Sequence, residues 1–294
     1  EAQYREYLAR VRAQQANKGA VPWLKAFPLK AMQEAGILPP GRLTAGFVES
    51  LVEPMLSFFG VASPEGWASQ YDQLQAQFRR ARPAAQTDVA AITAWLRMGE
   101  IQAQRREVPP FDAAKLEAAL PAMRDLTVAD AATIGQELTR LCAQAGVVLV
   151  FVPALQGTHV SGVARWLHGR PLIQLSLLGK WNDTFWFSFF HEVGHVLKHQ
   201  SRRAVYLDDA SSGDHTTSPD ELEANQFASE VLVPKALVSE LSQVALNEAS
   251  VRAWAAKVGL HPGIVVGQLQ HRKLLPWAHP LTRLKARYDI QTQA

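Results

Sequence analysis

The stretch TFWFSFFHEVGHVLKH, residues 184–199, decides how the second half of this chain folds. On an ideal helix turning about 100° per residue, with His191 at 0°, its apolar residues fall between about 120° and 260°. They are Phe185, Trp186, Phe189, Phe190, Val193, Val196 and Leu197. The sector from about 0° to 100° holds Ser188, His191, Glu192, His195 and His199. The pattern predicts a helix that packs one face into a core and presents histidines and a carboxylate on the other.

His191-Glu192-Val193-Gly194-His195 matches the H-E-x-x-H pattern. Two histidines four residues apart lie about one helical turn from each other, so both imidazoles can reach one zinc ion, while Glu192 stands beside the open coordination position. Gly194 lies between the two faces, where a missing side chain lets another backbone come close. The alternative is a partly buried histidine pair with ordinary hydrogen bonds.

A third zinc ligand is expected from residues 218–232, which begin with Ser-Pro-Asp-Glu and read as a helix. With Ala224 at 0°, the apolar stripe spans roughly 300° to 80°, Glu221 falls inside it near 60°, and Glu223 falls outside near 260°. A carboxylate facing the interior needs a cation, so Glu221 is the candidate ligand. Asn225, one turn further on, can hydrogen-bond a ligand imidazole. The alternative for Glu221 is a solvated carboxylate at a helix N-terminus.

A small sheet is predicted next to these helices. Residues 131–145 read as a helix ending at Gly146, and residues 147–152 as a buried strand. Residues 162–167 and 171–177, linked by three residues, predict a hairpin, and we expect 171–177 to be an edge strand that could align an extended peptide. Asn182 or Asp183 is expected to cap the helix that follows.

The fold class predicted is α+β, with an N-terminal all-helical domain, a small β-sheet zinc-peptidase domain and C-terminal helices. The expected boundaries are 1–125 for a helical recognition or regulatory domain, 126–245 for the metallopeptidase domain, and 246–294 for a helical extension packed on it. The N-terminal part is punctuated by proline and glycine and shows no strand pattern.

Composition excludes several classes of protein. The chain has 294 residues, 48% of them hydrophobic, and a formal net charge of +3 from 30 basic and 27 acidic residues, which is a mixed surface with no basic stripe for nucleic acid. The longest apolar run is shorter than the roughly 20 residues of a membrane span, and no signal-peptide core is evident, so a cytoplasmic protein is expected. The single cysteine, Cys142, excludes an internal disulfide and is expected to be a buried thiol.

The stretch FWFSFFHEVGHVLKH, followed by ELEANQFASEVLVP, resembles the ImmA/IrrE family of zinc metallo-endopeptidases. The family pattern is H-E-x-x-H, a short variable loop, then E-x-E-A-N-x-F-A with an apolar end and a proline, and the resemblance covers roughly residues 126–270. It implies that His191, His195 and Glu221 hold one Zn²⁺ per chain and that Glu192 is the general base. The Glu-x-x-x-Asn arrangement is also similar to the Glu-x-x-x-Asp of thermolysin-like enzymes.

The function expected is a zinc endopeptidase of narrow specificity. Relatives cleave helix-turn-helix repressors, so the resemblance implies a protein substrate, such as a DNA-binding regulator in stress response or in mobile-element or toxin–antitoxin control. An oxyanion donor is also expected, for which Tyr206, His199 and His215 are the candidates.

Two other functions stay open at the level of sequence. One is a transcription-regulator or antitoxin-like binding module that kept the protease fold, because residues 251–270 carry helix-turn-helix spacing. Its would-be recognition helix offers Ile264, Val265 and Val266 where base reading needs polar side chains, so packing on the peptidase domain is preferred. The other is a zinc-bound structural domain without hydrolysis, which is disfavoured because Glu192 is not needed for folding.

Overall fold

The computed structural model describes residues 17–71, 89–158, 160–176, 181–199, 206–209 and 218–288. The chain divides into two compact units, residues 1–98 with 154–158, and residues 99–153 with 159–294. The first unit is helical where it is described, and the second combines a sheet with helices, which confirms the α+β fold class. The division into three domains at residues 125 and 245 stays a prediction.

The first unit is built around a cluster of aromatic rings. Its helices are residues 17–24, α2 (Leu29–Glu34), α3 (Ala45–Ser50), α4 (Val52–Phe59), residues 64–71 and the first ten residues of α6 (Val89–Gln104). The rings of Phe27, Phe59 and Trp67 lie 5.3–6.2 Å apart at their centroids, in edge-on or tilted pairs. Such pairs each stabilise a core by about 0.5–1.5 kcal/mol beyond the area that they bury.

One stretch of this unit, Ala45–Tyr71, is long and apolar enough to span a membrane when judged by length and composition alone. A single stretch of this kind is weak evidence for a membrane protein. Its helices are also interrupted, because Gly60 adopts the left-handed conformation (φ +69°) that ends α4. The aromatic residues Phe59 and Trp67, on either side of that break, are both buried.

Among the described residues, the sheet of the second unit has four strands in the order β1-β3-β2-β4. The strands are β1 (Val148–Phe151), β2 (Val160–Leu167), β3 (Arg170–Leu175) and β4 (Tyr206–Asp209). β2 and β3 form the predicted antiparallel hairpin, with Leu167 opposite Arg170, and the turn residues His168 and Gly169 both have positive φ. This turn geometry matches the right-handed twist of the strands. The two predicted strand regions in the hairpin and the buried strand β1 are confirmed.

The prediction that residues 171–177 form an edge strand is wrong. β3 pairs in parallel with β1 and antiparallel with β2, so both of its hydrogen-bonding sides are occupied. All its residues from Pro171 to Leu175 are buried, as expected for a strand covered on both faces. In the part of the chain that the structure describes, β1 and β4 are the outer strands of the sheet, and β4 was not predicted.

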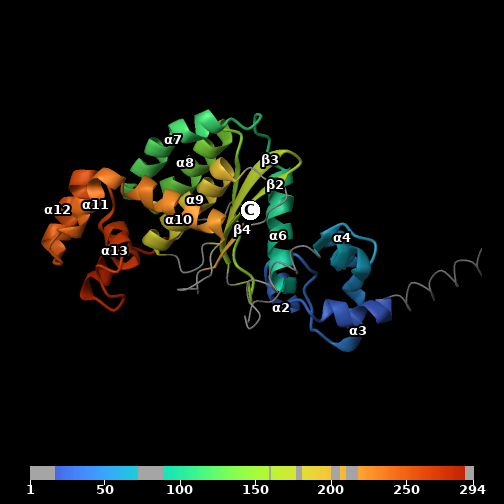
Figure 1. Cartoon of the computed structure of the whole chain (residues 1–294). Helices are drawn as coiled ribbons and strands as arrows, with labels where there is room; N and C mark the ends of the chain where they lie inside the picture. The colour runs from blue at the N-terminus through green and yellow to red at the C-terminus, as the bar shows by residue number, and fades with distance from the viewer. Residues whose placement is uncertain are drawn as a thin grey trace, which may run out of the picture. The chain divides into compact units, whose positions relative to one another are not determined.

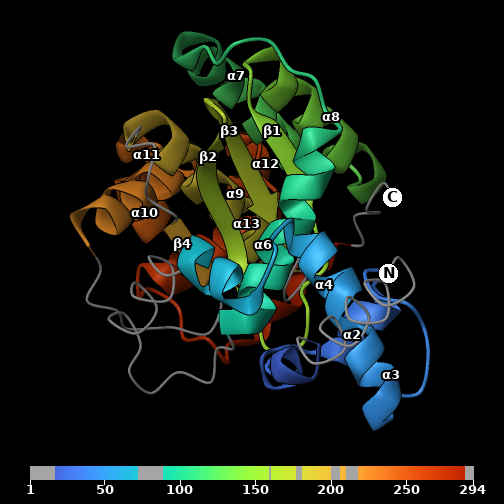
Figure 2. The ribbon, with the colours of Figure 1, turned by 90° about the vertical axis from the view of Figure 1, so that its right-hand side faces the viewer.

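Helices cover the sheet on both faces. α9 (Asn182–Lys198) packs against β2 and β3, and α10 (Pro219–Leu232) packs on α9 on the same side (Figure 1). Figure 2 looks onto the strands with α9 behind them. α8 (Ala131–Gln144) packs beside β1, and α7 (Ala113–Asp125) and η1 (Leu126–Val128) pack on α8. On the other face, Gln174 packs over Gly99 in the last part of α6.

The core beneath α9 is the aromatic face predicted from the sequence. All seven apolar residues of that face are buried in one cluster, together with Cys142 and the sheet residues Leu149, Ala164 and Ile173. The predicted cap is wrong: the residue before the helix is Trp181, which makes no capping bond. Asn182 instead accepts from the backbone N–H groups of Asp183 and Ala286, so its side chain joins the helix start to the C-terminal segment.

The remaining helices are α11 (Lys235–Ser242), α12 (Glu248–Val258), α13 (Pro262–His271) and the short η2 (Pro280–Leu284). α13 packs against α9, and the segment Ile264, Val265 and Val266 is buried there or in the core that α13 shares with α12. The residues that would face DNA in a helix-turn-helix motif are therefore interior residues. This placement agrees with the expectation that these residues pack against the rest of the second unit.

Candidate metal centre

The candidate site lies where α10 crosses α9. Gly194 makes this approach possible, because a Cβ at this position would lie 3.3 Å from the backbone Cα of Ala224 and 3.0 Å from the ring of Phe227. Ser218 caps α10 by accepting from the backbone N–H of Glu221, which fixes the first turn of the helix beside the histidines.

The ligand-type atoms of three residues meet at this crossing. The Nε2 atoms of His191 and His195 lie 2.9 Å apart. The Glu221 carboxylate places Oε2 3.2 Å from His191 Nε2, and Oε1 3.5 Å from His195 Nε2. The structure thus brings together the three residues that the sequence singled out as metal ligands, and in the described part of the chain they are the group of His, Cys, Asp and Glu residues that could hold an ion.

The outward ring nitrogens set the proton positions of both histidines. His191 Nδ1 lies 3.0 Å from Asn225 Oδ1, and His195 Nδ1 lies 3.0 Å from His199 Nδ1. Because the Asn225 oxygen can only accept, His191 donates its Nδ1 proton, and a neutral imidazole then carries a lone pair on Nε2. Asn225 therefore stands where the sequence analysis placed it, one turn after Glu221 and against a ligand histidine.

The spacing of these atoms fits a zinc ion. Four ligands arranged tetrahedrally at about 2.0–2.1 Å from an ion are separated from one another by about 3.3 Å. The two imidazole nitrogens are 2.9 Å apart, and each lies 3.2 or 3.5 Å from one oxygen of the Glu221 carboxylate, so the distances bracket that value. Two imidazole nitrogens and one carboxylate are also the donor set of catalytic zinc sites that keep a fourth position open for water. The residues present therefore fit the metal that the sequence predicts.

The electrostatics of the group favour a cation. Burial alone would raise the pKa of Glu221, but its hydrogen bonds and Coulomb attraction to His191 and His195 outweigh that effect and lower the pKa to about 2. Burial lowers the pKa of His195 below its usual value. Near neutral pH Glu221 is therefore ionised and the His195 ring is neutral, which are the protonation states that metal binding requires of these ligands.

Glu192 lies in the interior beside this group, completely buried between α9 and strand β2. Gly162 of β2 makes room for it, because a Cβ at that position would lie 2.8 Å from Glu192 Oε1. Gly162 was not singled out from the sequence. A glycine inside a strand run is the pattern that could have indicated such a close approach.

Of the three candidates for an oxyanion donor, the structure describes the side chain of His199 but not those of Tyr206 and His215. Both ring nitrogens of His199 are engaged away from the metal group, Nδ1 with His195 and Nε2 with Glu223 Oε2 at 3.1 Å. Tyr206 belongs to β4, where its backbone pairs with Ala164, and its side chain lies outside the described residues. His215 also lies outside them. The contact between His199 and Glu223 was missed, because Glu223 falls outside the apolar stripe of α10.

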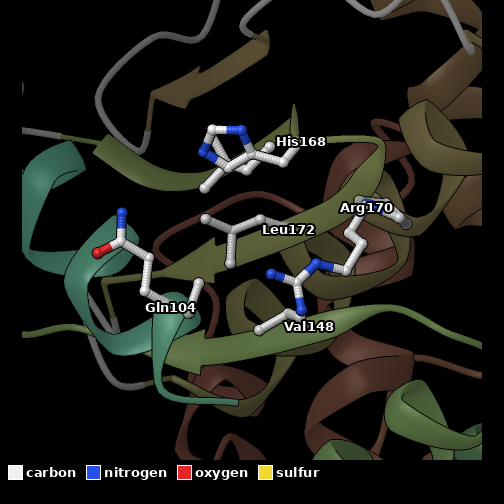
Figure 3. A pocket seen from close by; sticks show the side chains of 8 residues that line it. Gln104, Val148, His168, Arg170 and Leu172 are labelled. Atoms are coloured by element: carbon white, nitrogen blue, oxygen red, sulfur yellow. The ribbon is translucent and has the colours of Figure 1, made fainter. Parts of the chain in front are cut away.

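A shallow hollow lies on the opposite face of the sheet, around the β2–β3 turn and the end of α6 (Figure 3). Its lining consists of Ala103, Gln104, Val148, Leu167, His168, Arg170, Pro171 and Leu172. Leu172 alternates with Ile173, whose side chain belongs to the core beneath α9, so the hollow and the metal group lie on different sides of β3. None of the candidate site residues contributes to this hollow.

Comparison with known protein families gives one match. Residues 142–269 match the family model Peptidase_M78, described as the IrrE N-terminal-like domain. The matched region contains the whole sheet and both helices that form the candidate metal centre. No curated protein matches the chain. The resemblance drawn from the H-E-x-x-H and E-x-E-A-N-x-F-A motifs is thereby confirmed.

Proposed function

We propose that this chain, which carries a domain of the Peptidase_M78 family, is a zinc-dependent endopeptidase. One observation carries the proposal: His191, His195 and Glu221 converge at ligand separations that suit zinc, and Glu192 is buried next to them. A domain held together by a metal without hydrolysis needs the three ligands but gains nothing from a second carboxylate that is completely buried. Burying such a group is costly, so its presence favours a chemical role.

Each residue then has a distinct role. His191, His195 and Glu221 would hold the ion, which when bound supplies Lewis acidity that acidifies a water and polarises the scissile carbonyl. Glu192 accepts the proton of the attacking water and passes it to the leaving amine. Asn225 orients the ring of His191 by accepting a hydrogen bond from its Nδ1–H group. The oxyanion donor stays open between Tyr206 and His215, since His199 is engaged elsewhere.

We propose β4 as the strand that aligns the substrate, in place of the central strand β3. β4 forms one edge of the sheet, pairs with β2 through Leu207 and Val163, and contacts α9. An extended peptide can add to the free side of such an edge by main-chain hydrogen bonds. The scissile bond would then lie beside the helix that carries Glu192.

The substrate we propose is a regulatory protein, such as a helix-turn-helix repressor, cut at few sites. This rests on the resemblance alone, as does a role in stress response. We also propose a cytoplasmic location, from the sequence composition, and a recognition or regulatory role for residues 1–125, whose proline-punctuated helices carry no catalytic motif. Direct nucleic-acid binding by this chain is not expected. The alternative of a DNA-binding module loses support because Ile264, Val265 and Val266 are buried.

The test compares the full chain with Glu192→Gln. Glutamine keeps the shape of glutamate but cannot accept the proton, so both proteins should bind about one zinc per chain. Each is incubated with a cell extract, and new protein N-termini are identified by mass spectrometry. Cleavage sites should appear with the wild type. The rate of cleavage at these sites should be lower by 10²-fold or more with the variant.

The matched control is Glu230→Gln, the same substitution on α10 at a residue that contacts Gln226 and Lys235. It should cleave like the wild type. If Glu192→Gln cut the same sites as fast as the wild type, the hydrolytic mechanism would be wrong. If neither protein cut anything while both bound zinc, the binding-module alternative would be the better account.

A further inference from the structure

We propose that His199 and Glu223 are positioning residues that hold His195 as a metal ligand through a directed chain of two hydrogen bonds, an inference that rests on the proposed zinc site. The chain runs from His195 Nδ1 to His199 Nδ1 at 3.0 Å, and from His199 Nε2 to Glu223 Oε2 at 3.1 Å. It joins the buried end of the site to a carboxylate that is 57% exposed at its side chain.

The position of each proton follows from the metal group. His195 Nε2 faces His191 Nε2 and the Glu221 carboxylate, so it must offer a lone pair to an ion. Its neutral ring then carries its proton on Nδ1, and this N–H donates to His199 Nδ1. His199 can accept only with a lone pair on Nδ1, which puts its own proton on Nε2. That proton points to Glu223.

The two bonds therefore have one consistent direction, from the metal side toward the surface. His199 is almost completely buried, with 7% of its side chain exposed, so its ring has little freedom to turn away. A second carboxylate, Asp220 Oδ1, lies 3.8 Å from His199 Nε2, beyond the distance of a direct hydrogen bond. Glu223 is thus the acceptor, and Asp220 adds negative charge beside it.

The two ligand histidines are supported in different ways. The ring of His191 donates directly to a neutral amide, Asn225. The ring of His195 donates to a second imidazole whose far nitrogen meets a carboxylate. A carboxylate that polarises an imidazole raises the basicity of the nitrogen bound to metal, and removing such partners typically weakens metal binding by about 10–100-fold. We assign His199 and Glu223 to this role for His195.

The first test uses the unmodified full chain loaded with zinc and labelled with ¹⁵N at histidine. Long-range ¹⁵N–¹H NMR spectra distinguish protonated from unprotonated ring nitrogens. The expected result is a proton on Nδ1 of His195, an unprotonated Nδ1 on His199, and a proton on Nε2 of His199. A His199 ring with its proton on Nδ1, or with protons on both nitrogens, would overturn the proposal, because it could not accept from His195.

The second test measures zinc affinity by competition with a chelator. His199→Phe keeps a ring but can neither accept nor donate, and we expect it to bind zinc about 10–100-fold more weakly. His199→Gln can accept from His195 through its side-chain oxygen and should recover part of that loss. Glu223→Ala should weaken binding less than His199→Phe, because water can replace an exposed carboxylate. Glu230→Gln on the same helix is the control and should leave the affinity unchanged.

The outcomes separate this inference from the proposed function. If the wild type bound zinc and His191→Ala abolished binding, while His199→Phe bound as tightly as the wild type, the positioning role would be wrong and the zinc site would stand. If the wild type bound no zinc, both would fail.

Discussion

Replacing Gly194 by alanine tests whether the crossing of α9 and α10 sets the geometry of the metal group. The added methyl group would lie 3.3 Å from the Cα of Ala224 and 3.0 Å from Cδ1 of Phe227. Comfortable contacts between carbon atoms are about 3.5–4.0 Å, so α10 must move by about 0.5 Å. The ring of Phe227 can turn aside, but the backbone at Ala224 cannot. Glu221 lies three residues before Ala224 and moves with it.

Two effects on stability oppose each other. Alanine is favoured over glycine inside a helix by about 1 kcal/mol. Overpacking a buried contact costs about 1–3 kcal/mol. The free energy of unfolding should therefore be unchanged or fall by up to about 2 kcal/mol. Zinc affinity should fall more clearly, by tenfold or more, because ligand distances must hold to within about 0.2 Å.

The assay combines urea unfolding with zinc titration against a chelator. Gly46→Ala is the matched control: Gly46 is also helical, in α3, and no atom would lie within 4 Å of the new Cβ. It should gain up to about 1 kcal/mol and leave zinc affinity unchanged. If Gly194→Ala behaved in the same way as this control, the reasoning about the helix crossing would be refuted.

Three further predictions concern other buried positions. Gly162→Ala should lower the rate of peptide cleavage by about 10²-fold, the scale expected when a catalytic group is misplaced by about 1 Å. Zinc binding should be retained. An unchanged rate of cleavage at an established site would contradict the close approach of Gly162 to Glu192. Cys142 is fully buried, and burial raises the pKa of its thiol to about 12. A thiol reagent at pH 8 should therefore label Cys142 only when the protein is unfolded. Rapid labelling of the native protein would count against the buried placement of this residue. Glu100→Ala should destabilise the fold by about 3 kcal/mol in urea unfolding, because it removes the carboxylate 2.7 Å from the buried Arg165; a loss below about 1 kcal/mol would show that Arg165 does not depend on this pair.

Local patterns predicted the helices of the second unit well, because local chemistry fixes their ends. Asp130 caps α8 by accepting from Ala132 and Thr133, and Gly146 follows that helix with φ +79°. The helical wheel likewise placed His191 and His195 on one face, because four residues make about one turn.

Strand order was not predictable in the same way. The parallel pairing of β1 with β3 joins residues 24 apart, Val148 with Leu172, and no short pattern encodes such a partner. The run from Pro171 to Leu175 did contain a warning: strands buried on both faces lack alternation of apolar and polar residues, and this run has a single polar residue, Gln174. The four residues of β4 include two aspartates and give no strand pattern.

The partner of His199 was hidden for a related reason. A wheel ranks the positions of one helix by their apolar neighbours, so it placed Glu223 in the solvent sector, and the residue is indeed 57% exposed at its side chain. What brings it to the site is the angle at which the two helices cross. That angle depends on how α10 packs on α9, including the close approach of Gly194 to Ala224, and sequence periodicity does not describe it.

One helix, α10, supplies three residues of the site: Glu221, the candidate carboxylate ligand, Asn225, which contacts the ring of His191, and Glu223, which contacts the ring of His199. A slip of one residue along α10 would turn it by about 100° and shift it by about 1.5 Å, which displaces all three side chains together. Among descendants of this sequence, α10 can therefore accept substitutions at an outward position such as Leu222, which is 57% exposed, but not an insertion or deletion between Glu221 and Asn225. The three side chains therefore keep their places at the site only as long as their spacing along α10 is unchanged.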